Sequence, residues 1–166
     1  MSDRKAGAAS ARRPRQASGQ PATTSYDKDV IVWSQEQARL LRAGRFADLD
    51  VEHLADEIED VGKSEKRELA SRMAVLLAHL LKWSRQPENR GKSWRSTITL
   101  QRKRIALAIK ATPSLKAVIR DNDWQEDMWL DALAQASSET GLAMEDFPDA
   151  CPWTMDQAAD QEFWPE

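Results

Sequence analysis

The chain has 166 residues and a mass of 18.8 kDa, which suits one domain that buries its core without a disulfide or a metal ion. Its one cysteine, Cys151, excludes an internal disulfide and a multi-cysteine zinc site, and no apolar run approaches the ~20 residues of a membrane span. The net charge of −3 conceals four blocks, with +4 on residues 1–25, −6 on 26–61, +12 on 62–120 and −13 on 121–166. These properties predict a charge-rich, soluble helical protein, which we expect in the cytoplasm without contact to a membrane.

The first 25 residues differ in composition from the remainder of the chain. They are rich in Ala, Ser, Arg, Gln and Pro and hold no large apolar side chain after Met1. Such a segment cannot bury enough surface to offset its ordering entropy. We therefore expect a disordered basic tail over residues 1–25 and a single all-helical domain over residues 26–166.

Helical periodicity begins directly after this tail. Ser25 is expected to cap a first helix, and Gly44 is expected to end it. Asp50 is expected to cap a second helix, whose apolar face comprises Leu54, Ile58 and Val61. Gly62 either interrupts that helix or only weakens it. From residue 64 to about residue 85, a wide Leu-rich stripe predicts a central helix with neighbours on more than one side.

The second half of the chain continues the helical pattern and then becomes irregular. Ser93 is expected to cap a fourth helix, and a fifth is expected over about residues 115–139, kinked or broken at 121–123. Thr154 and Gln157 have the spacing of a capping box for one short helix. No alternating strand pattern is present. We predict an all-α fold, a compact bundle of five or six helices with an irregular, aromatic-rich C-terminal segment packing across it.

Several strings along the chain are similar to one bacterial family. The chain resembles the domain of unknown function 29 family through "LDVEHLADEIEDVGKSEKREL", "LLAHLLKW", "SWRSTI", "TPSL" and "EFWPE", in that order. The resemblance covers about residues 26–166 and implies a compact all-helical bacterial domain. Trp129 stands where the family more often has tyrosine. The family has no established activity, so the resemblance sharpens the expected fold and leaves the function open.

A polar network is predicted around the histidine of the central helix. His79 lies on a Leu-rich stripe, where both ring nitrogens need partners. We expect it to meet Glu57 from the acidic helix and Arg95, with Thr97, from the next helix. This network favours a structural role in fixing helix register. The alternative is a catalytic or ligand-binding pocket, so whether the chain is an enzyme stays open, with a preference against it.

No cofactor or metal site is expected. His53 and Glu57 share a helical face, but two histidines and one cysteine make a closed zinc site hard to build. Cys151 has acidic neighbours that raise its pKa, so it is not interpreted as a nucleophile.

A basic surface is predicted around the loop after the central helix. Its members are Lys82, Arg85, Arg90, Lys92, Arg102, Lys103 and Arg104. Together with Trp83 and Trp94 they are suited to phosphates and bases, which makes a nucleic-acid-associated accessory protein one alternative. The other interpretation is neutralisation by the acidic blocks on either side, and the chain's pI of about 5.5 favours it. We therefore expect a non-catalytic protein-interaction module with a protein partner.

Overall fold

The computed structural model of the protein describes residues 25–166, so nearly all of the predicted tail lies outside the described part. Within that part the chain forms six α-helices and no strand, which confirms the predicted all-α fold. The chain groups into two compact units that divide between Ala55 and Asp56, where we had predicted a single domain. No described helix is both long enough and apolar enough to cross a membrane.

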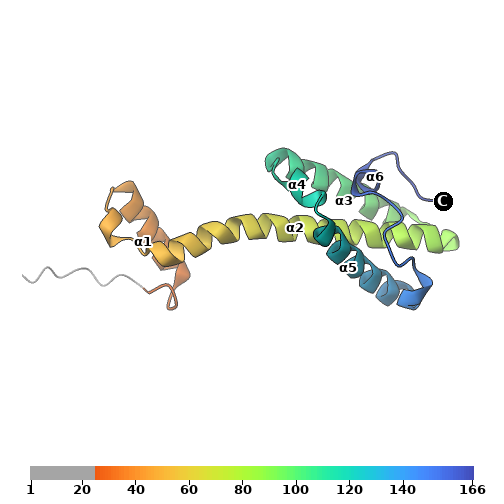
Figure 1. Cartoon of the computed structure of the whole chain (residues 1–166), viewed down its shortest axis with the longest axis horizontal. Coiled ribbons are helices and arrows are strands. Elements are labelled where there is room, and N and C mark those ends of the chain that lie inside the picture. The colour runs from red at the N-terminus through yellow and green to blue at the C-terminus, as the bar shows by residue number, and fades with distance from the viewer. Residues whose placement is uncertain (1–24) are drawn as a thin grey trace, which may run out of the picture. The chain divides into compact units, whose positions relative to one another are not determined.

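The first unit consists of α1 (Val30–Arg42), the short 3-10 helix η1 (Phe46–Asp48) and the beginning of α2 (Figure 1). Asp29, not the predicted Ser25, caps α1, because its carboxylate accepts from two backbone N–H groups of the first turn at 3.1 and 3.0 Å. Ser25 instead closes a turn through its carbonyl. Gly44 has a φ of +69° and ends the helix region as predicted.

α2 (Val51–Arg85) is one continuous helix of 35 residues, so Gly62 does not interrupt it. The expected core face at its beginning is wrong, because Ile58 is 71% exposed and Val61 is 67% exposed. Regular spacing shows that these residues share a helix face but does not supply an element to cover that face. From Leu69 onward the helix is largely buried, as the wide apolar stripe predicted.

The second unit surrounds the C-terminal half of α2. Its further elements are η2 (Pro87–Asn89), α3 (Lys92–Ala111), α4 (Leu115–Ile119), α5 (Asn122–Thr140), η3 (Met144–Asp146) and α6 (Met155–Ala159). Figure 1 shows α3 and α5 on either side of this half of α2. One core cluster joins them, with Leu76 and Leu80 from α2, Ile98 from α3, and Trp129 and Leu133 from α5.

Local signals define most helix ends of the second unit. Asp121 caps α5 by accepting from the backbone N–H of Trp124 at 2.9 Å, so the expected kink or break is the boundary between α4 and α5. The capping box of Thr154 and Gln157 begins α6 as predicted. Ser93 does not cap α3, because the helix begins at Lys92, one residue before Ser93. Gly91 occupies the N-cap position and provides no side-chain hydrogen bond.

Candidate functional site

His79 lies in the buried half of α2 with both ring nitrogens engaged. Its Nδ1 lies 2.9 Å from the carbonyl oxygen of Val75, and its Nε2 lies 3.4 Å from Nζ of Lys82. A lysine ammonium can only donate, so Nε2 accepts, Nδ1 donates and the ring is neutral. Burial, together with the positive charge of Lys82, holds the pKa of His79 below its ordinary value. His79 is therefore a bonded core group without a nitrogen free for acid–base chemistry.

Lys82 joins the ends of two helices. Its residue is only 4% exposed, and its ammonium forms an ion pair with Glu139 near the end of α5. Burial raises the pKa of Glu139, but its hydrogen bonds with Lys82 and with the Gln135 amide outweigh this and lower it. This pair links the basic middle block of the sequence to the acidic block that follows.

The predicted network of Glu57, His79, Arg95 and Thr97 does not form. Glu57 precedes His79 by 22 residues on the continuous helix α2, which at 1.5 Å per residue separates them by about 33 Å. Thr97 donates to the carbonyl of Ser93 at 3.2 Å, within its own helix. The prediction failed because it required the acidic helix to turn back at Gly62.

Arg95 belongs instead to an aromatic cluster. Its guanidinium lies 5.4 Å from the centroid of the Trp83 ring and 5.1 Å from that of Trp164. Arg90 also lies 5.4 Å from the Trp83 ring and donates from Nε to the Trp83 carbonyl at 2.7 Å. The two tryptophan rings are 4.8 Å apart. This stacking stabilises the C-terminal segment against the end of α2.

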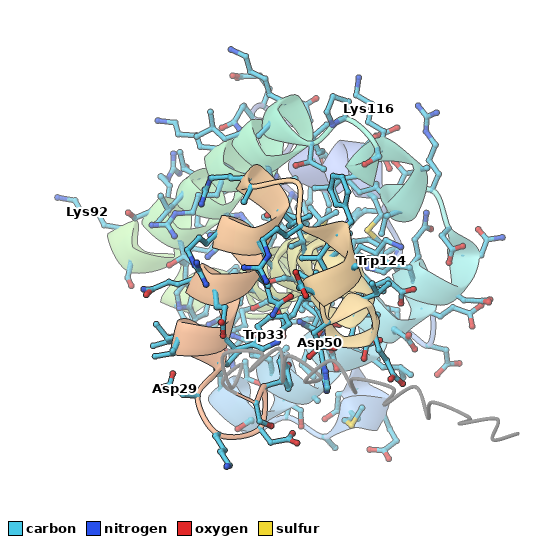
Figure 2. All side chains as sticks on the ribbon, turned by 90° about the vertical axis from the view of Figure 1, so that its left-hand side faces the viewer. Asp29, Trp33, Asp50, Lys92, Lys116 and Trp124 are labelled. Atoms are coloured by element: carbon cyan, nitrogen blue, oxygen red, sulfur yellow. The ribbon has the colours of Figure 1, made fainter. Side chains whose placement is uncertain are left out.

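The predicted basic surface contains two residues that are not on the surface. Lys82 is buried in the ion pair described above, and Arg102 is only 1% exposed. The remaining five members are exposed, namely Arg85, Arg90, Lys92, Lys103 and Arg104. Figure 2 shows Lys92 pointing away from the molecule.

Arg102 fastens the C-terminal segment to α3. Its Nε donates to the carbonyl of Ala158 at 2.8 Å, and its two terminal nitrogens donate to the carbonyls of Gln161 at 3.5 Å and Phe163 at 2.6 Å. Its guanidinium also lies 5.2 Å from the Trp164 ring centroid. Burial lowers the pKa of Arg102. Its place between Ile98 and Ile105, four residues after one and three before the other, is the sequence signal that could have predicted its burial.

The aromatic C-terminal segment packs across the bundle as predicted. Trp129 donates from Nε1 to the carbonyls of Pro148 and Asp149 at 3.3 and 3.2 Å. Its ring meets that of Trp153 edge-on, and Trp153 in turn meets Phe163. At the position of Trp129 the resembled family more often has tyrosine. In this chain the indole N–H of Trp129 binds two backbone carbonyls of the C-terminal segment.

A second polar cluster, which the sequence did not reveal, lies in the first unit. Asp50 caps α2 as predicted, accepting from the backbone N–H of His53 at 3.4 Å. Its Oδ2 also receives Nε1 of Trp33 at 3.0 Å and lies 2.8 Å from Nδ1 of His53. The backbone N–H of Asp50 donates to the Gln37 side chain at 2.9 Å. Figure 2 shows Trp33 and Asp50 side by side, and the ring of Tyr26 stacks on His53 at 4.3 Å.

This cluster joins the residues of the first unit through one carboxylate. Burial raises the pKa of Asp50, but the hydrogen bonds from His53 and Trp33 outweigh this and lower it. The hydrogen bond with Asp50 raises the pKa of His53, and the nearby carboxylates of Asp27 and Glu52 add to the effect. The spacing of Asp50 and His53, three residues apart at a helix start, was the available signal for the pair.

A cleft of about 740 Å³ lies in the second unit between α5 and the C-terminal segment. Trp129, Leu130, Trp153 and Met155 line it, together with Cys151. Burial raises the pKa of the Cys151 thiol, which donates to the Trp153 carbonyl at 3.1 Å. The raised pKa disfavours the reactive thiolate, and its cause is burial, whereas the sequence suggested the acidic neighbours. No group of three or more metal-ligating side chains occurs within residues 25–166.

Comparison with known proteins identifies the class of this helical bundle. The chain matches the family described as Domain of unknown function DUF29 over residues 25–164, nearly all of the described chain. It therefore belongs to that family, as the resemblance implied. No curated protein and no solved structure gives a significant match.

Proposed function

We propose that the chain is a non-catalytic protein-interaction module that binds a separate protein through its first unit. The observation that carries this proposal is the number of large apolar side chains that this unit exposes. They are Val30, Ile31, Val32, Leu41, Phe46 and Val51. Its buried hydrophobic residues are only Trp33 and Leu40 within the described part. An exposed apolar surface of this kind marks an interaction site.

Two of these side chains, Val30 and Leu41, lie on one side of α1 and form a stripe beside its buried face. Val30, Ala38 and Leu41 recur at spacings of eight and three residues, with Ser34 between them, which places them on one side of the helix. The buried stripe of Trp33, Gln37 and Leu40 lies next to it. The described part of this unit, residues 25–55, buries only a few apolar groups, and so small a core gives little stability by itself. A partner that covers the stripe therefore completes its core.

The chemistry of the stripe defines the partner. Val30 and Leu41, with the half-buried Ala38 between them, fit the apolar face of an amphipathic helix. Arg42 is exposed beside Leu41 and has no ion-pair partner among residues 25–166. The partner helix is therefore expected to carry an acidic residue that lies near Arg42. The polar side chains around His79 form hydrogen bonds within their own cluster, and those around Asp50 do the same. These internal hydrogen bonds support a module without catalysis.

A photo-crosslinking amino acid at Leu41 tests this proposal in the cells that naturally produce the chain. The same group at Arg39, on the side of α1 opposite to Leu41, is the matched control. The expected result is one discrete adduct with a different protein from position 41 and none from position 39. Val30→Asp should abolish that adduct. Equal labelling from both positions, no adduct at all, or an adduct containing only a second copy of this chain would overturn the proposal.

A further inference from the structure

Two exposed helix faces in the second unit carry opposite charge. α3 contains no acidic residue, and its exposed side carries Lys92, Lys103 and Lys110. α5 contains no basic residue, and its exposed side carries Asp123, Asp127 and Asp131. None of these six side chains has an ion-pair partner within residues 25–166. The charge segregation of the sequence is therefore concentrated on these two helices, with no neutralisation between their exposed sides.

Each charged face also carries exposed leucine. On α3, Leu107 is 64% exposed, and Leu100 is exposed seven residues, or two helical turns, before it. On α5, Leu130 is 56% exposed and is followed one turn later by the small, exposed Ala134. The basic face thus carries two exposed leucines, and the acidic face carries one exposed leucine next to a small alanine side chain. Such a combination is suited to helix packing as well as to charge attraction.

We propose that the α3 face of one chain binds the α5 face of a second copy of the same chain. A second copy is the expected partner because α3 and α5 have similar lengths, 20 and 19 residues, and carry opposite charges along their exposed sides. The two faces belong to different helices that both pack on the core, so they cannot satisfy each other within one unit. Contact between two different faces is heterologous, and it produces rings or open chains of copies.

This self-association is independent of the apolar stripe on α1. The proposed function concerns a different protein and the first unit, whereas this contact uses only the second unit of each copy. Variants of α3 and α5 therefore leave the crosslink at Leu41 in place. Failure of one proposal does not entail failure of the other.

Sedimentation equilibrium of the full chain at increasing concentration tests the contact. At about 50 mM salt the chain should associate, and at about 500 mM the dissociation constant should rise by about tenfold or more, because exposed charge pairs are screened. Lys110→Glu should abolish association. Lys116→Glu, an exposed lysine of α4 with the same charge change, is the matched control and should leave it intact (Figure 2).

Mixing two defective variants provides the sharper readout. Asp127→Lys alone should be monomeric, because its α5 face repels the basic α3 face. A mixture of Lys110→Glu and Asp127→Lys chains should associate again, since each altered face meets a complementary partner. Circular dichroism shows whether both variants are folded. If either is unfolded, the Leu107→Ser variant is measured instead, and it should also weaken association because it removes an exposed leucine from the α3 face.

Three results would overturn the self-association. The first is a wild-type chain that stays monomeric at low salt, including one that binds nucleic acid or another protein through α3 instead. The second is equal loss of association in the Lys116→Glu control. The third is a mixture of folded variants that does not associate.

Discussion

Replacing Arg102 with alanine should loosen the C-terminal segment. The change removes a buried side chain that donates to the carbonyls of Ala158, Gln161 and Phe163. The Gln161 and Phe163 carbonyls belong to a segment that is exposed or half-buried, so water can replace their donor. Ala158 is fully buried, so its carbonyl loses its donor without such a replacement.

The magnitude follows from these contacts. A buried carbonyl left without a donor costs about 1–3 kcal/mol, and the space vacated by a buried side chain adds a cavity term of about 1–2 kcal/mol. Relief of the desolvated guanidinium offsets part of this. We therefore expect Arg102→Ala to lower the free energy of unfolding of the second unit by about 2–4 kcal/mol, and Arg102→Lys by less, since an ammonium cannot reach all the carbonyls.

Urea unfolding followed by circular dichroism measures the overall effect, and amide hydrogen exchange over residues 158–164 localises it. Arg104→Ala is the matched control, because that exposed residue on the same helix should change the stability by less than about 0.5 kcal/mol. The reasoning is refuted if Arg102→Ala unfolds like the control while the amides of the C-terminal segment keep their protection.

Three further outcomes follow from the polar groups. Glu139→Gln leaves the buried Lys82 ammonium without its counterion and should destabilise the second unit by about 2–4 kcal/mol; an unchanged urea midpoint would contradict the ion pair. The pKa of His53 is raised in the folded chain, so its contribution to stability is complete below the unfolded pKa of about 6.5 and is lost as the pH rises through the folded pKa. The pKa of His79 is lowered, so its contribution to stability is present above about 6.5 and is lost as the pH falls through the folded pKa. NMR titration of the two ring signals should show His53 above and His79 below the pKa of a model peptide, and the reverse order would refute both environments. Cys151 should react with a neutral thiol reagent more slowly than a free thiol at pH 8; a rate equal to that of an unfolded control would show an accessible thiolate.

The sequence predicted best where a signal acts locally. The capping box of Thr154 and Gln157, the stop at Gly44 and the cap at Asp50 each depend on neighbours within four residues, and each is present. Ser25 and Ser93 failed as caps because a second competent start lay close by, at Asp29 and after Gly91. Propensity alone does not choose between adjacent starts.

The candidate site was harder to predict because it depends on contacts between distant segments. His79 was expected to need partners, and it has them, but Lys82 replaced the predicted Glu57 because α2 does not turn at Gly62. Arg102 was assigned to the surface by its charge, although its helical register with Ile98 placed it inside. Charge identifies a residue that needs solvation, and buried carbonyls can meet that need as well as water does.

The exposed stretch of α2 over residues 58–68 has a practical consequence for protease sensitivity. This stretch is held mainly by its own backbone, helped by the Lys63–Asp60 pair at 3.0 Å and opposed by Gly62, which costs about 1 kcal/mol relative to alanine. Helical stretches of about 11 residues that bury no side chain are marginal. Trypsin, which cleaves after Lys63, Lys66 and Arg67, should therefore cut here before it cuts the buried half of the helix. Brief digestion then yields a fragment that lacks the first residues of the second unit and begins at residue 64, 67 or 68, and the stability of this fragment can be measured.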